Sequence, residues 1–167
     1  LNKNVVQRFY HGRFKNVGEA LKENTKITLL MFNYRGDFNP RHNYPHKPML
    51  NFFTGIFFIL GLGYAIFTLF NPASFYAIIF FIIFIIPGIV TIEAPQGLRN
   101  IIVIPSIILF TGIFFNKFIQ YLNEQYGKKT KIITSLIFII LFLSMGYNFF
   151  DIYFNKQAKD NTCWAAF

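Results

Sequence analysis

The chain has 167 residues, of which 54% are hydrophobic and only 14% are charged, and its formal net charge is +9. A soluble domain carries about 25% charged residues, so this composition argues against a soluble domain and predicts an integral membrane protein. The basic residues lie mainly in segments that connect apolar runs, which favours membrane lipid or a phosphorylated lipid as partner and argues against nucleic acid. The single cysteine, Cys163, excludes an internal disulfide.

The N-terminal part of the chain is basic and amphipathic. Residues 1–17 mix Lys and Arg with aromatic residues, which indicates an interfacial or loop segment. Over residues 18–33, apolar side chains recur near helical spacing, and the apolar end of this segment is too short to span a bilayer. We therefore expect an amphipathic helix that lies in the membrane surface.

A polar loop with the sequence RGDFNPRHNYPHKP follows this helix, over residues 35–48, and ends where an apolar run begins. Its three prolines fix φ and bias the preceding residues towards extended shapes, so the loop backbone is expected to be preset. Arg offers a planar fork for oxyanions, which suits a phosphate-bearing partner at the bilayer surface. A basic loop beside a span is more often a simple anchor to anionic lipid, and that interpretation stays open.

Four apolar runs are expected to cross the membrane as helices, over residues 49–70, 75–92, 101–115 and 132–150. Asn71-Pro72 separates the first two runs. Glycines in the first run would let a neighbouring helix approach closely. Pro87-Gly88 is expected to kink or loosen the end of the second run.

The predicted fold class is an all-α polytopic membrane protein with four transmembrane helices and one interfacial amphipathic helix. Residues 1–48 would form the interfacial segment and the polar loop, 49–150 the four-helix region, and 151–167 a juxtamembrane tail. Four spans would place both termini and the loop 35–48 on one membrane face, and the basic connector 116–131 on the other. Lys and Arg are plentiful on both sides, so the positive-inside rule does not decide the orientation.

A second polar segment, EAPQGLRN over residues 93–100, separates the second and third apolar runs. Glu93 and Arg99 are the only acidic or basic residues between Lys47 and Lys117. Such residues are costly near a bilayer and are usually kept for pairing or for function. Either they are a simple pair at two helix ends, or Glu93 holds Arg99 or a substrate hydroxyl while Arg99 joins Arg41 on a phosphate.

A metal site is a weaker hypothesis. His42 and His46 lie four residues apart near Asp37, but Pro45 argues against a helix that would place both imidazoles on one side. No Gly-rich phosphate loop and no nucleophile elbow is present in the sequence. We therefore expect no identifiable metal or cofactor in this chain, although a full-length enzyme could use a divalent metal.

Taken together, the two polar segments resemble the bacterial family 39 glycosyltransferases, the phospholipid carrier-dependent, protein-O-mannosyltransferase-like enzymes of the GT-C type. The stretch RGDFNPRHNYPHKPML is similar to their GDxNxRHNxPxxPxL motif, and EAPQGLRNIIVIP is similar to the EAPhxLRxxgxxP motif one span later. The resemblance covers about residues 20–115. It departs at His46-Lys47, where the family more often has Gly followed by a basic residue.

The resemblance implies a multi-span enzyme of the inner membrane. It would transfer a sugar from a polyprenyl-phosphate carrier to an acceptor, with the termini and both polar segments extracytoplasmic. Neither the sugar nor the acceptor is indicated. The residues expected near the carrier phosphate or the sugar hydroxyls are Arg35, Asp37, Asn39, Arg41, His42, Asn43, Lys47, Glu93 and Arg99.

In that family the presumed catalytic acid is usually an Asp in the first external loop, and this chain has no candidate for that loop. We therefore expect the chain to be the C-terminal membrane fragment of a longer enzyme, inactive by itself; a complete small protein is the alternative. The rival function is a non-catalytic membrane module, either a transporter half or an assembly subunit anchored to anionic lipid. No inverted repeat of the transporter kind is evident in the sequence.

Overall fold

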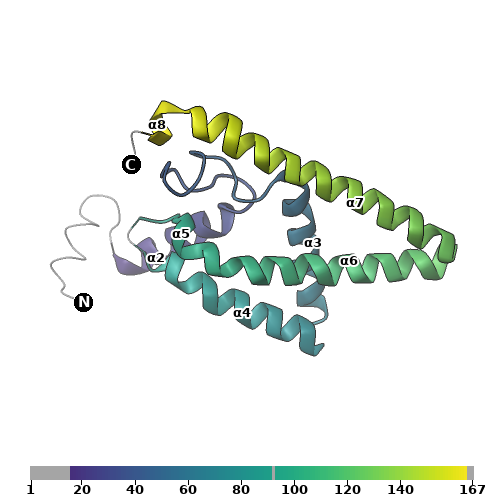
Figure 1. Cartoon of the computed structure of the whole chain (residues 1–167). Helices are drawn as coiled ribbons and strands as arrows, with labels where there is room; N and C mark the ends of the chain where they lie inside the picture. The colour runs from purple at the N-terminus through teal and green to yellow at the C-terminus, as the bar shows by residue number, and fades with distance from the viewer. Residues whose placement is uncertain (1–15, 92, 165–167) are drawn as a thin grey trace.

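The computed structural model describes residues 16–91 and 93–164, and over these residues it is helical, with no strand. Figure 1 shows three long helices, α4, α6 and α7, with a shorter helix, α3, running across α6. The interfacial segment predicted over 1–17 lies almost wholly outside the described residues. The all-α fold class is confirmed for the described part of the chain.

Helix α2, Val17–Leu30, occupies most of the segment that we predicted to be an amphipathic helix. The side chain of Asn16 begins it by accepting a hydrogen bond from the Glu19 backbone N–H at 2.8 Å. Of the apolar residues that predicted the helix, Ala20 is buried, whereas Leu21 and Leu30 are exposed. The helix therefore presents apolar side chains outward, as a helix at a membrane surface would.

The buried face of α2 is small and polar, and it packs against α4, Pro72–Ile89. Asn24, one turn after Ala20, is only 3% exposed. Its side-chain amide donates to the carbonyl oxygens of Ile89 and Thr91, at 3.0 and 2.9 Å. These carbonyls lie at the end of α4, where a helix leaves acceptors without intrahelical partners, so Asn24 ties α2 to that end.

Helix α3, Phe52–Phe67, lies within the first predicted span. Its 16 residues measure about 24 Å, against a hydrocarbon core of about 30 Å. Within the described residues, three helical segments are long and apolar enough to cross a membrane: Pro72–Ile89, Gly97–Tyr126 and Ile132–Lys159. Three of the four predicted spans are thus supported by length and composition, and the span predicted over 49–70 is not confirmed.

The crossing of α3 and α6, Ile104–Tyr126, is very close. A Cβ atom built on Gly61 would collide with the backbone carbonyl of Phe110, so only glycine fits at this position of α3. The rings of Phe58, Phe81 and Phe110 meet beside the crossing, with centroids 5.7 to 6.1 Å apart. The hydrophobic core therefore lies where α3, α4 and α6 come together.

The connector that we predicted over 116–131 is helical on both sides of Gly127. Between Gly112 and Gly127 the sequence has neither glycine nor proline, so nothing in it ends α6 before Tyr126. Gly127 ends the helix with a φ of +80°, and α7 begins at once and spans Lys128–Phe150. The helical segment that contains the predicted third span, 101–115, runs from Gly97 to Tyr126. It therefore extends beyond that span at both ends.

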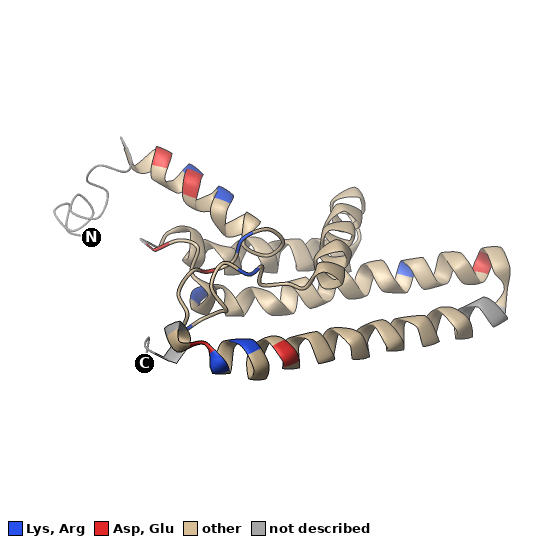
Figure 2. Ribbon diagram, turned by 90° about the horizontal axis from the view of Figure 1, so that it is seen from above, with Lys and Arg blue, Asp and Glu red and all other residues tan. Residues whose placement is uncertain are grey.

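The C-terminal part of the chain is also helical, where we predicted a juxtamembrane tail. After α7 come a π-helical segment, η2, Asp151–Lys156, a 3-10 turn, η3, Gln157–Lys159, and α8, Asn161–Trp164. Together α6 and α7 form a long hairpin whose tip projects beyond α3 and α4 (Figures 1 and 2). The other end of the hairpin lies with α2, α5 (Gly97–Asn100) and the polar loop.

Candidate functional site

The polar loop is built from two successive side-chain turns. A carboxylate oxygen of Asp37 accepts a hydrogen bond from the backbone N–H of Asn39 at 2.8 Å, and the side-chain oxygen of Asn39 accepts one from the N–H of Arg41 at 3.1 Å. Asp and Asn favour such turns because their short side chains reach the N–H two residues on. The D-x-N-x-R pattern thus shapes this part of the loop through local hydrogen bonds.

The two ends of the loop are held together by backbone contacts. The N–H groups of Gly36 and His46 donate to the carbonyl oxygens of Lys47 and Asp37, both at 3.2 Å. The Asn43 side chain also donates to the Lys47 carbonyl, at 2.6 Å. A Cβ atom on Gly36 would collide with that carbonyl, so the closure requires glycine there. The loop is therefore a compact, closed unit.

Asp37 joins the two polar segments. Its side chain is buried, with 1% of the residue exposed. One carboxylate oxygen, Oδ2, accepts the backbone N–H of Gly97 at 2.7 Å and lies 2.8 Å from Nδ1 of His42. A buried carboxylate needs several donors to offset its lost hydration, and one of them here, the Gly97 N–H, lies 60 positions from Asp37 in the sequence. The two polar segments thus meet at Gly97.

The predicted site residues fall into two groups. Asp37 is buried, and Asn39, His42 and Asn43 are partly buried within the hydrogen-bonded loop. The five others are exposed, namely Arg35, Arg41, Lys47, Glu93 and Arg99. Neither Glu93 nor Arg99 forms an ion pair with any residue that the structure describes. The partly buried group holds the loop shape, and the charged side chains of the other group lie at the surface.

Lys and Arg residues occur on α2, in the polar loop, on α5 and near the C-terminus at the loop end of the molecule, whereas α3 and α4 carry none (Figure 2). The C-terminal part contributes to this end, because the Gln157 side chain donates to the Pro40 carbonyl at 3.4 Å. Lys156 pairs there with Asp151 at 3.0 Å. A second set of charged residues, in the sequence 117–131, lies towards the opposite end of α6.

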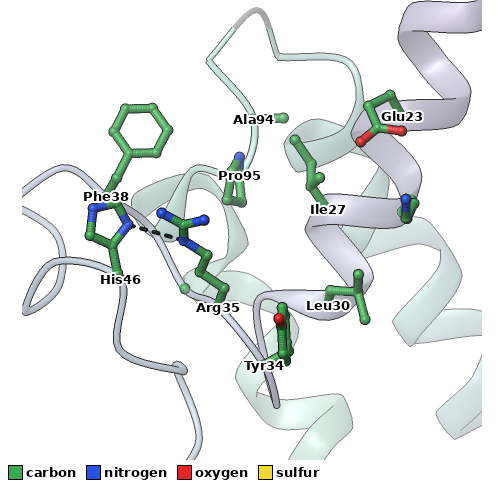
Figure 3. A pocket seen from close by; sticks show the side chains of 11 residues that line it. Glu23, Ile27, Leu30, Tyr34, Arg35, Phe38, His46, Ala94 and Pro95 are labelled. Carbon is green, nitrogen blue, oxygen red and sulfur yellow. Dashed lines mark hydrogen bonds between the residues drawn. The ribbon is translucent and has the colours of Figure 1, made fainter.

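A pocket of about 470 Å³ opens between α2 and the polar loop (Figure 3). Its walls include Glu23 of α2 on one side and Arg35 of the loop on the other, with Pro95 of the second polar segment between them. The Arg35 Nε donates to Nδ1 of His46 at 3.3 Å, which holds the guanidinium over the pocket. The exposed rings of Tyr34 and Phe38 complete the loop side.

Only Arg35 among the pocket residues was predicted from the sequence. Glu23 and Lys26 lie in the segment that was predicted to be a surface helix, and His46 was considered only as a metal ligand. The available signal was local: Tyr34 and Phe38 flank Arg35, and aromatic residues beside a cation in a polar loop indicate a binding surface. Within the described residues, no group of three His, Cys, Asp or Glu side chains is placed to hold a metal ion.

The chain matches no protein-family model, no curated protein sequence and no solved structure. The resemblance to the family 39 glycosyltransferases therefore rests on the two sequence motifs alone. Within the described residues, the membrane character rests on the three long apolar helices.

Proposed function

We propose that this chain is the membrane part of a glycosyltransferase that takes a sugar from a polyprenyl-phosphate carrier and passes it to an acceptor outside the cytoplasm. The polar loop, residues 35–48, and the segment 93–100 would face the extracytoplasmic side of the inner membrane. The observation that carries the proposal is the bond from Gly97 to the buried carboxylate of Asp37, at 2.7 Å, because it joins the two segments that carry the resemblance.

The proposed chemistry is an inverting transfer from a phosphodiester donor. The departing carrier phosphate gains negative charge as its bond to the sugar breaks. Preset cations stabilise such charge best when they need no rearrangement. The hydrogen-bonded loop supplies a fixed backbone for Arg41 and Lys47, and α5 supplies Arg99. The base that activates the acceptor is not assigned among these residues.

The test uses the complete polypeptide in proteoliposomes with a radiolabelled polyprenyl-phosphate sugar. Arg41→Ala and Arg99→Ala should each lower the transfer rate by about 10²-fold, the effect of removing one group that stabilises developing negative charge. Lys117→Ala is the matched control, because that exposed cation lies on α6 and bonds to Gln120. Unchanged turnover in both arginine variants would refute the assignment of the site.

A second candidate is a non-catalytic membrane module that binds anionic lipid. The exposure of Arg35, Lys47 and Arg99 at one end of the molecule favours it, since basic residues at a membrane surface attract anionic headgroups. In this case, neutralising these three cations would weaken the preference for phosphatidylglycerol over phosphatidylcholine in nanodiscs. No transfer would be detected with any polyprenyl-phosphate sugar.

A further inference from the structure

The pocket between α2 and the polar loop carries opposite charges on its two walls (Figure 3). On the loop wall, the Nε of Arg35 donates to Nδ1 of His46 at 3.3 Å, and the two terminal nitrogens of the guanidinium still have N–H groups to offer a ligand. On the helix wall stands the carboxylate of Glu23. An anion suits the first wall and a cation suits the second, so the pocket matches a ligand that carries both charges.

The carboxylate of Glu23 decides what the helix wall binds. The residue is partly buried, and it forms no ion pair with any residue that the structure describes. A carboxylate that has lost part of its hydration is best stabilised by a charged donor. Lys26 also lines the pocket without pairing with Glu23, and it is exposed, so its flexible stem can keep the ammonium group in water. A ligand ammonium group with N–H donors is therefore the expected partner of Glu23.

The pocket lies at the level where the apolar run 49–70 begins. The backbone N–H of Met49 donates to the carbonyl oxygen of Met31 at 3.0 Å, so the residues that follow α2 lie beside the start of that run. Leu30 lines the pocket and is 42% exposed, so apolar surface continues from the pocket to the outside of α2. Tyr34, which also lines the pocket, has an exposed ring of the kind that gathers at membrane–water interfaces. A ligand held here by its charged end can therefore extend apolar chains into the bilayer.

We propose that this pocket binds the headgroup of a zwitterionic phospholipid, phosphatidylethanolamine, with its phosphate at Arg35 and its ammonium group at Glu23. The planar guanidinium can donate to two phosphate oxygens, and the ammonium group brings three N–H donors to the carboxylate. At about 470 Å³ the pocket falls within the range of about 300–1,000 Å³ that small-molecule sites occupy. The inference does not depend on sugar transfer, and it differs from binding of anionic lipid because the helix wall requires a ligand cation.

The experiment is native mass spectrometry of the purified chain in detergent. The chain is titrated with an equimolar mixture of phosphatidylethanolamine, phosphatidylcholine and phosphatidylglycerol that share the same acyl chains. Phosphatidylcholine carries the same charges, but its ammonium group has no N–H to donate, and phosphatidylglycerol has the phosphate without a cation. The first lipid retained should be phosphatidylethanolamine, preferred about tenfold over each of the others, the size of one lost hydrogen bond between charged groups.

Four variants assign the selectivity to individual side chains. Glu23→Gln should remove the preference, so that the three lipids are retained alike. Arg35→Gln should weaken the retention of all three about tenfold, because each carries the same phosphate. Lys26→Gln should keep the preference for phosphatidylethanolamine. Glu124→Gln, an exposed change near the far end of α6, is the matched control and should change nothing. These residues are exposed or partly buried, so the variants should fold.

A soluble competitor separates the lipid from a free phosphate ester with the same headgroup. Glycerophosphoethanolamine has no acyl chains, so at equal concentration it should not displace the retained lipid.

Four results would overturn the inference. They are no preference among the three lipids, a first preference for phosphatidylglycerol, a preference that survives Glu23→Gln, and displacement of the lipid by glycerophosphoethanolamine. The second result would mean a plain anionic-lipid site, and the fourth a soluble ligand. No polyprenyl-phosphate sugar is present in the measurement, so a failure of lipid selectivity and a failure of the proposed sugar transfer are separate outcomes.

Discussion

The buried carboxylate of Asp37 holds the polar loop together and joins it to the second polar segment. Asp37 is buried in a chain with few acidic residues, and its oxygens are engaged by the Asn39 N–H, the Gly97 N–H and the His42 imidazole. Exposed arginines around it can adapt to a partner, but Asp37 cannot move without leaving a buried charge unpaired. Its role is therefore to position the loop and to hold it against Gly97.

Replacing Asp37 tests this positioning role. Asp37→Asn keeps the size of the side chain but replaces one accepting oxygen with a donor, so at least one charge-assisted hydrogen bond is lost. We expect the free energy of unfolding to fall by about 1.5–3 kcal/mol, measured by chemical denaturation in detergent. Asp151→Asn removes the carboxylate of a partly exposed ion pair with Lys156 and should have a much smaller effect. Equal losses in the two variants would contradict the proposed role.

At the level of elements, hydropathy predicted where helices occur better than where they end. The runs over 75–92 and 132–150 correspond to α4 and to most of α7. The segment 116–131 was assigned to a connector because it is polar, but helix formation requires backbone hydrogen bonds and not apolar side chains. The informative residue was Gly127, whose positive φ ends α6.

The candidate site was predictable from the sequence only where its structure depends on neighbouring residues. The D-x-N pattern of the loop and its prolines are local signals, so the compact loop followed from the sequence. The contact of Asp37 with Gly97, and the pocket wall supplied by Glu23, depend on how α2, α4 and α5 pack. Asn24 sets that packing through two carbonyls at the end of α4, a long-range contact that periodicity alone does not indicate.

The crossing of α3 over α6 depends on one glycine and can be tested with a matched pair. Gly61→Ala would push a methyl group into the Phe110 carbonyl, so the helices must separate, at a cost of about 1–3 kcal/mol. Gly63→Ala lies two residues later on the same helix and meets no atom within 4 Å. Denaturation in detergent should show a clear loss for the first variant only. A comparable loss at both positions would contradict the role of the crossing, because alanine favours helix more than glycine does and Gly63→Ala should otherwise leave α3 as stable or more stable.

Polar segments lie at both ends of the long apolar helices. The end of α4, the start of α6 and the end of α7 lie together with the loop, α5 and the last turns of the described chain (Figure 1). Because Glu93 precedes α6 and Glu124 lies in its last turn, the two residues should face opposite sides of a bilayer. Asn155, beyond α7, should share the side of Glu93.

This arrangement predicts a labelling pattern in intact cells. In a Cys163→Ser background, Glu93→Cys and Asn155→Cys should react with a membrane-impermeant maleimide added outside. Glu124→Cys should react only after the membrane is permeabilised. Reaction of all three from the same side would refute the assignment of α6 and α7 as spans. The reverse pattern would keep the spans but invert the proposed orientation.

The projecting turn at Gly127 is a suitable place to insert an antibody epitope. It stands apart from α2 and the polar loop, and α6 and α7 connect it to the remainder of the protein (Figure 2). An antibody bound to a short epitope inserted there would enlarge a particle that is otherwise too small for single-particle imaging. It would leave the end of the molecule with the polar loop uncovered. Antibody access to the same insertion would show on which side of the membrane the turn at Gly127 lies.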